Sequence, residues 1–127
     1  MNAFLLVGLG GALGAIARYG SGVLTGRFWP SAFPIVTLSI NVLGSLLMGL
    51  LVGALARYTP AWQAEARLFL AIGVLGGFTT FSSFSLDTIA LIERGEVLSA
   101  LLYIGLSVGL SLAGLALGLL MMRGVPA

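Results

Sequence analysis

The sequence lacks several residue types on which many binding and catalytic sites depend. It contains no cysteine, no histidine and no lysine, and only 8% of its 127 residues are charged. Without cysteine the chain forms no disulfide and no thiolate metal site, and without histidine it lacks the commonest proton shuttle. A soluble domain carries roughly 25% charged residues. The composition therefore excludes an ordinary soluble domain.

Positive charge is sparse and is not clustered. The net charge of +2 comes from six arginines and four acidic residues, and the arginines occur singly. A nucleic-acid-binding surface needs a clustered basic face, so we expect no nucleic-acid partner. What the chain does contain is apolar: 59% of its residues are hydrophobic and the mean hydropathy is +1.14. This composition predicts an integral membrane protein in contact with lipid, with one domain over residues 1–127.

Four apolar segments are long enough to cross a bilayer, since a helical span needs about 20 residues. The predicted spans are residues 3–24, 33–56, 66–92 and 97–122. No basic region precedes the first, so we expect a span there and not a cleaved signal peptide. The expected fold class is an all-α membrane protein with four transmembrane helices.

The third apolar segment contains an unusual polar interruption. Residues 76–84 read Gly-Gly-Phe-Thr-Thr-Phe-Ser-Ser-Phe, and the segment is long enough for two half-helices. Irregular backbone at membrane depth is tolerated only where protein encloses it or where it lines a cavity. The pattern predicts that the third helix is broken near its middle, over residues 76–80, and that a functional site lies there.

The arginines give little information about orientation. Four spans place both termini on one side, with three arginines there and three on the other: Arg57, Arg67 and Arg123 against Arg18, Arg27 and Arg94. Because basic residues normally fix orientation, this balance is compatible with insertion both ways and with an antiparallel homodimer. The alternative is that one or two charges in the flanks decide the orientation.

Two helical faces carry hydrogen-bonding side chains every four residues. They are Thr37, Asn41 and Ser45 in the second span and Tyr103, Ser107 and Ser111 in the fourth. Such groups often simply connect membrane helices, but two complete stripes also suit a narrow, uncharged track. The first, second and fourth spans have no deep acidic residue, which favours a passive pathway over proton-coupled exchange.

Three further side chains have two interpretations each. Phe81 and Phe84 share a face of the second half-helix and are either ordinary apolar residues or a pair whose positive ring edges contact a small anion. Arg18 lies within or at the margin of the first span. It either extends to the membrane interface or forms a fixed positive charge in a vestibule.

Three motifs, taken together, carry a family resemblance. They are Gly10-Gly11-x-x-Gly14-Ala15-x-x-Arg18-Tyr19, then Asn41-Val42-Leu43-Gly44-Ser45, and the segment from Gly76 to Ser85. Over nearly its whole length the chain resembles the small bacterial fluoride channels called Fluc or CrcB. The resemblance implies passive, fluoride-selective efflux across the cytoplasmic (inner) membrane, fluoride resistance, and no enzymatic activity.

The resemblance also implies an assembly and a set of site residues. The assembly is a dual-topology antiparallel homodimer with two pores and a central structural sodium ion, held by the backbone carbonyls of Gly76 and Thr79. The implied fluoride pathway consists of Asn41, Phe81, Phe84, Ser82, Ser83, Thr37, Tyr103, Ser107 and Ser111, with Arg18 in the vestibule. Two positions depart from the family pattern, because Ser82-Ser83 replaces the usual Ser-Thr and Asp87 replaces the usual Glu.

Two other classes remain as alternatives. A small four-helix multidrug exporter would need a carboxylate in the first span, and residues 3–24 contain none. Substrate-driven proton release would favour it. An accessory membrane subunit without transport activity would explain the closely spaced glycines, but not the polar stripes beside a double-aromatic break.

Overall fold

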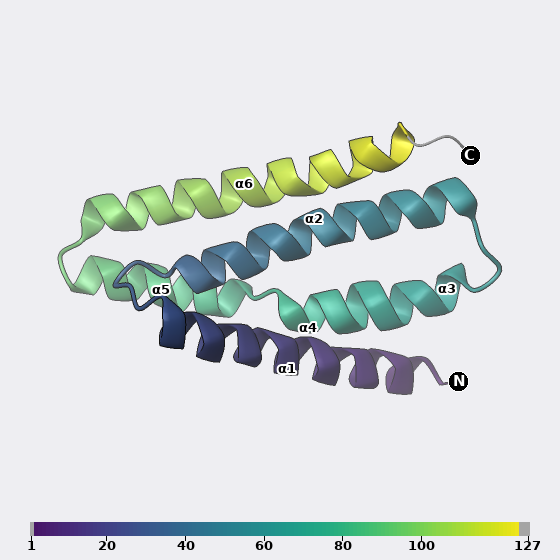
Figure 1. Ribbon diagram of the computed structural model, residues 1–127, viewed down its shortest axis with the longest axis horizontal. Coiled ribbons are helices and arrows are strands. Elements are labelled where there is room, and N and C mark those ends of the chain that lie inside the picture. Colours follow the sequence, from purple (N-terminus) through teal and green to yellow (C-terminus); the bar gives the residue numbers. More distant parts are fainter. Residues whose placement is uncertain (1, 125–127) are drawn as a thin grey trace.

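The chain folds into four long helical spans in the computed structural model, which describes residues 2–124 (Figure 1). Three spans are single helices: α1 (Ala3–Phe28), α2 (Ile35–Tyr58) and α6 (Val97–Arg123). The third is composed of α3 (Gln63–Ala66), η1 (Arg67–Leu75), α4 (Gly76–Phe78) and α5 (Phe81–Glu93). All four are long and apolar enough to cross a membrane, as predicted. The start of α1 and the end of α6 lie at the same end of the bundle.

The third span is broken at two residues, Thr79 and Thr80, which both have extended backbone conformations. The amide and hydroxyl of Thr79 both donate to the carbonyl of Leu75, at 3.0 Å each, and so close the first half-helix. The hydroxyl of Thr80 accepts from the amide of Ser83 at 3.1 Å, which is the usual way a threonine begins a helix. The predicted break is confirmed, and it is narrower than predicted because Gly76 and Gly77 remain helical.

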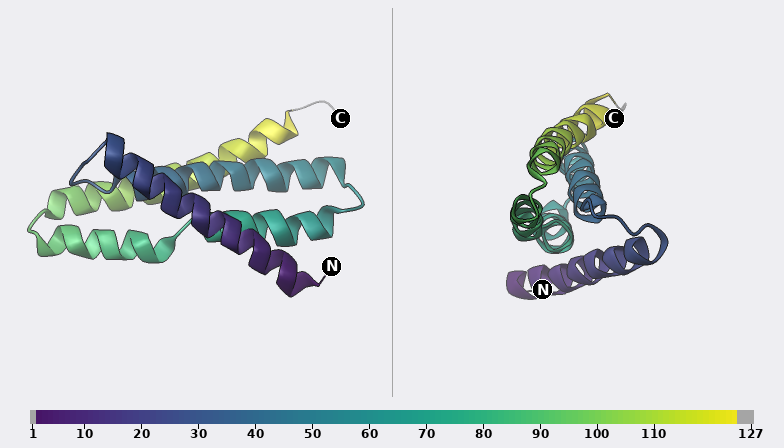
Figure 2. Two further views of the ribbon diagram at one scale, coloured as in Figure 1. Left: turned by 60° about the horizontal axis from the view of Figure 1, so that its bottom comes forward. Right: turned by 90° about the vertical axis from the view of Figure 1, so that its left-hand side faces the viewer.

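The half-helix before the break has an unexpected form. The nine residues of η1 are a π-helix, and such helices are rare and mostly confined to single turns. The segment packs against α1, which crosses the third span at an angle (Figure 2).

Glycines set the two closest helix crossings. A Cβ atom on Gly10 of α1 would lie 2.9 Å from the Cα atom of Gly73, and one on Gly77 would lie 2.5 Å from the carbonyl oxygen of Gly11. A Cβ atom on Gly118 would lie 2.6 Å from backbone atoms of α2, so α6 and α2 also approach through a glycine. Small residues are expected where membrane helices approach this closely.

The break is anchored to a small aromatic core at one end of the bundle. The fully buried Tyr103 packs edge-on against Phe33, with ring centroids 5.6 Å apart, and against Phe84, at 5.2 Å. Since Tyr103 lies in α6 and Phe84 in α5, these contacts fix the second half-helix against α6. Tyr103 also donates a hydrogen bond of 3.1 Å to a carboxylate oxygen of Asp87.

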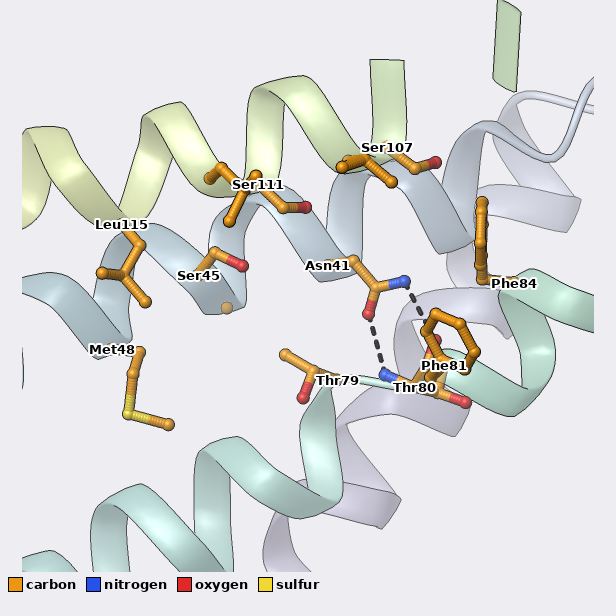
Figure 3. Close-up of a pocket in the computed structure, with 13 residues that line it drawn as sticks. Asn41, Ser45, Met48, Thr79, Thr80, Phe81, Phe84, Ser107, Ser111 and Leu115 are labelled. Carbon is orange, nitrogen blue, oxygen red and sulfur yellow. Dashed lines mark hydrogen bonds between the residues drawn. The ribbon is translucent and has the colours of Figure 1, made fainter. Parts of the chain in front are cut away.

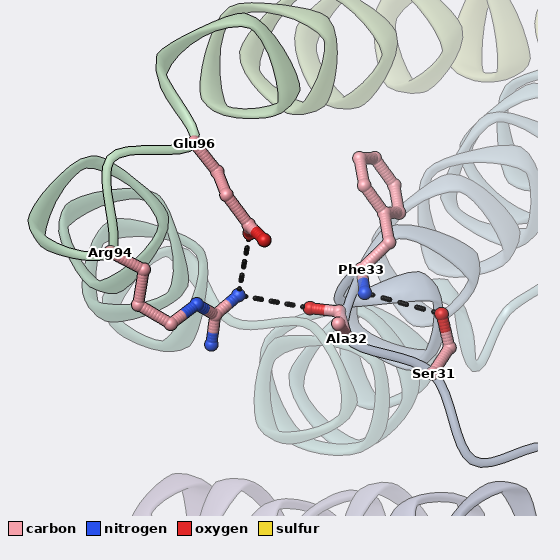
Figure 4. Close-up of polar contacts among 5 residues, drawn as sticks. All are labelled: Ser31, Ala32, Phe33, Arg94 and Glu96. Atoms are coloured by element: carbon pink, nitrogen blue, oxygen red, sulfur yellow. Dashed lines mark hydrogen bonds and ion pairs between the residues drawn. The ribbon is translucent and has the colours of Figure 1, made fainter.

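Polar contacts join the two connections at that same end (Figure 4). The guanidinium of Arg94 donates to the carbonyl of Ala32 at 3.1 Å and pairs with Glu96 at 3.1 Å. The α5–α6 turn is therefore tied to the α1–α2 connection. Both side chains of the ion pair are about half exposed, so the pair itself contributes at most about 1 kcal/mol.

Candidate functional site

A groove of about 380 Å³ lies where the break faces α2 and α6 (Figure 3). One part is lined by uncharged polar side chains and the other by apolar ones such as Met48 and Leu115. The polar and aromatic residues that line it are Asn41, Ser45, Thr79, Thr80, Phe81, Phe84, Ser107 and Ser111. The groove thus combines parts of both predicted polar stripes with both predicted phenylalanines.

Asn41 joins α2 to the break through two hydrogen bonds. Its side-chain Nδ2 donates to the carbonyl of Thr80 at 3.0 Å, and its Oδ1 accepts from the amide of Thr80 at 2.8 Å (Figure 3). The side-chain amide therefore pairs with an extended residue much as a neighbouring β-strand would. One Nδ2 hydrogen remains for another acceptor, since the amide group has two.

The hydroxyl of Ser107 is the least satisfied polar group of the groove. The residue is 6% exposed, and its Oγ atom has no hydrogen-bond partner among the described residues. Buried hydroxyls normally have a partner, so such an atom requires an explanation. Ser111 lies one turn further along the same face of α6 and also lines the groove. Together they present hydroxyl donors and no charge.

The two phenylalanines are positioned differently from each other. Phe84 is partly buried and contacts Tyr103, whereas Phe81 is 77% exposed at the surface of the single chain. Their ring centroids are 5.5 Å apart with the planes tilted by 52°. The core fixes Phe84, and Phe81 extends the aromatic surface to the outside of the chain.

A second cavity, of about 400 Å³, lies on another side of Thr80 and is lined by Arg18, Thr37 and Ser83. The Nε atom of Arg18 donates to the carbonyl of Gly77 at 3.1 Å. In a continuous helix that carbonyl would accept from residue 81, so the arginine replaces a bond lost at the break. The side chain is therefore turned to the break.

Three predicted site residues lie outside both cavities. Tyr103 is in the core behind the groove, and Ser82 is exposed with its hydroxyl 3.2 Å from that of Thr80. Gly76 is in the last turn before the break. Their assigned roles stay predictions, as do the roles assigned to the other predicted site residues. Sequence reasoning missed the pairing of Thr80 with Asn41, for which the only signal was the second threonine of the motif.

The helices and the groove together indicate a general class of protein. Four spans, one of them broken, and a groove of uncharged donors describe a multi-pass membrane protein whose site suits a small solute or ion. Residues 5–119 match the family described as CrcB-like protein, Camphor Resistance (CrcB). The chain belongs to this family.

Individual relatives align with almost the whole chain. It is 52% identical over 125 residues to a protein of Hyphomonas neptunium, covering 98% of each. It is 52% identical over 124 residues to one of Paracoccus denitrificans, covering 98% of this chain and 97% of the relative. It is 50% identical over 125 residues to one of Rhizobium meliloti, covering 98% and 99%. All three relatives bear the name fluoride-specific ion channel FluC.

Proposed function

We propose that the chain forms a fluoride-selective ion channel through which fluoride leaves the cytoplasm passively, giving fluoride resistance. The observation that carries the proposal is the groove beside the break, where hydroxyl, amide and phenyl groups meet without a fixed charge. The names of the relatives agree with it. Membership of this family also makes the protein a channel and not an enzyme.

The donors of the groove suit a small, strongly hydrated anion. Fluoride enters a narrow path only if protein groups replace its water, and it leaves only if those groups do not bind it too strongly. The unpartnered hydroxyl of Ser107, the free Nδ2 hydrogen of Asn41 and the ring edges of Phe81 and Phe84 supply positive partial charge without a full charge. A lysine or arginine at this position would hold the anion too firmly.

The arrangement of acidic groups supports passive transport. No carboxylate lines the groove, and Asp87, in the second half of the third span, accepts a hydrogen bond from Tyr103 outside it. Proton-coupled carriers use a carboxylate that both the proton and the substrate reach. The groove therefore provides a pathway but no proton-exchange step.

The antiparallel dual-topology homodimer, with two pores, is part of the proposal. Phe81 is 77% exposed on the single chain although it lines the groove, so a second copy is well placed to complete the wall. None of the hydrogen bonds in residues 2–124 ends on the carbonyl oxygens of Gly76 or Thr79. Two such pairs of carbonyls from crossing breaks would hold the structural sodium ion at the dimer centre.

Fluoride release from liposomes tests the proposal. Purified protein is reconstituted into vesicles loaded with potassium fluoride, and an electrode records release after valinomycin makes the membrane permeable to potassium. We expect rapid fluoride release, with far slower chloride release from matched vesicles. Protein-free vesicles are the control. Release at the protein-free rate, or equal release of the two anions, would refute the proposal.

Vesicles prepared without sodium test the ion at the dimer centre, which we expect to be needed for full flux.

A further inference from the structure

The ends of α2 and α6 bring two arginines together at one edge of the bundle. Arg57 lies in the last turn of α2 and Arg123 in the last turn of α6. An Nη atom of Arg57 donates to the main-chain carbonyl of Arg123 at 3.3 Å. The Nε atom of Arg57 is buried and has no partner among the described residues. Since a guanidinium has five N–H donors, most donors of this pair have no partner within the part of the chain that the structure describes.

Within residues 2–124, no acidic side chain forms an ion pair with either arginine. The ion pair found within residues 2–124 joins Arg94 to Glu96 at the opposite end of the bundle. The two arginines therefore form a patch of positive charge at the level where the spans leave the apolar layer. Guanidinium groups bind phosphate through paired hydrogen bonds, and an anion here would satisfy both charges.

An apolar groove begins directly beneath the two guanidiniums. It has a volume of about 610 Å³ and runs between α2 and α6, with walls formed by Val52, Ala56, Leu119 and Met122. Gly53 also lines the groove, and a Cβ atom there would lie 2.8 Å from the side chain of Met122 in α6. Such an apolar surface does not stabilise a soluble anion, whereas it does stabilise a bound acyl chain.

We propose that this site binds one anionic phospholipid, with its phosphate on Arg57 and Arg123 and an acyl chain in the groove below. Charge complementarity selects the headgroup, and the groove selects a lipid over free phosphate. The site lies at the end of the bundle away from the aromatic core, and it shares no lining residue with the groove beside the break.

Native mass spectrometry of the full, detergent-purified chain tests the proposal. Delipidated protein is titrated with phosphatidylglycerol, with the zwitterionic phosphatidylcholine of the same acyl chains, and with inorganic phosphate. We expect preferential binding of phosphatidylglycerol. An interfacial arginine contributes about 1 kcal/mol to the binding of anionic lipid, so Arg57→Gln and Arg123→Gln should each weaken binding about fivefold. Circular dichroism and elution volume verify that each variant is folded.

Two further variants separate the possible sources of binding. Arg67→Gln removes the same charge on the same side of the membrane but away from the groove, and should leave affinity within about twofold. Ala56→Leu narrows the groove while keeping both arginines, and should weaken phosphatidylglycerol binding. Equal affinity for the two lipids would overturn the proposal, as would an Arg67→Gln effect as large as that of Arg57→Gln. Inorganic phosphate binding as tight as that of phosphatidylglycerol, unaffected by Ala56→Leu, would instead indicate a free-anion site and also overturn it.

Discussion

The two hydrogen bonds between the Asn41 side chain and the Thr80 backbone yield a specific structural prediction. Asn41→Leu keeps the approximate size of the side chain but removes both hydrogen bonds to the Thr80 backbone. Leaving a buried backbone group without its partner costs about 1–3 kcal/mol, and Thr80 is half-buried, so we expect a loss of about 2–4 kcal/mol for the two groups. The loss falls on the break itself and not on the four spans.

Hydrogen–deuterium exchange measured by mass spectrometry locates that loss. The Thr80 amide is protected by its 2.8 Å bond to Asn41, and each 1.4 kcal/mol of lost protection accelerates exchange about tenfold. In Asn41→Leu, a peptide spanning residues 76–85 should therefore exchange one amide at least about tenfold faster. Ser45→Ala removes a hydroxyl one turn away on the same helix face and should leave that peptide unchanged. Equal protection of the peptide in wild type and Asn41→Leu would refute the claim that the Asn41–Thr80 hydrogen bonds stabilise the break.

Three other predictions concern the pathway and the helix crossings. Asn41→Asp keeps an acceptor for the Thr80 amide but places a negative charge in the groove, so fluoride release from liposomes should stop; undiminished release would move Asn41 off the pathway. Phe81→Ile and Phe84→Ile should both reduce fluoride release while cross-linking still detects a dimer, and unaltered release in both would remove the phenyl-edge role. Gly10→Ala places a Cβ atom 2.9 Å from the Cα atom of Gly73 and against the carbonyl oxygen of Phe69, and should destabilise the protein by about 1–3 kcal/mol in thermal melts. Gly8→Ala, whose Cβ atom would have no atom within 4 Å, should not, and similar melts for the two would contradict the tight α1–η1 crossing.

The larger features of the fold could be predicted because they follow from composition and length. Four apolar segments of about 20 residues dictate four spans. The polar interruption after Leu75 could be identified as a break because hydroxyls and glycines have no reason to face lipid. Its exact position could not. The break was predicted over residues 76–80, but Gly77 lies in close contact with α1 and stays helical, so only the two threonines form the break.

The sequence indicated the residue types of the candidate site but not the hydrogen bonds that these residues form. Four of the six residues in the i,i+4 stripes line the groove, with Asn41 and Ser45 from α2 and Ser107 and Ser111 from α6, whereas Thr37 and Tyr103 do not. Helical periodicity shows which residues share a face of a helix, but not how deeply each of them is buried. It therefore did not show that Tyr103 lies behind the groove and donates a hydrogen bond to Asp87. Nor does it show that Asn41 and Arg18 replace hydrogen bonds lost at the break, because those contacts depend on how α1 and α2 cross the third span.

The most direct test of passive, selective conduction is a reversal potential in a planar bilayer. Protein is incorporated between solutions of potassium fluoride at a tenfold gradient, with potassium chloride added equally to both sides. A pore selective for fluoride predicts a current that reverses near the fluoride equilibrium potential, about 59 mV from zero at 25 °C. Reversal at zero, or at a potential that follows an imposed chloride gradient, would contradict the account.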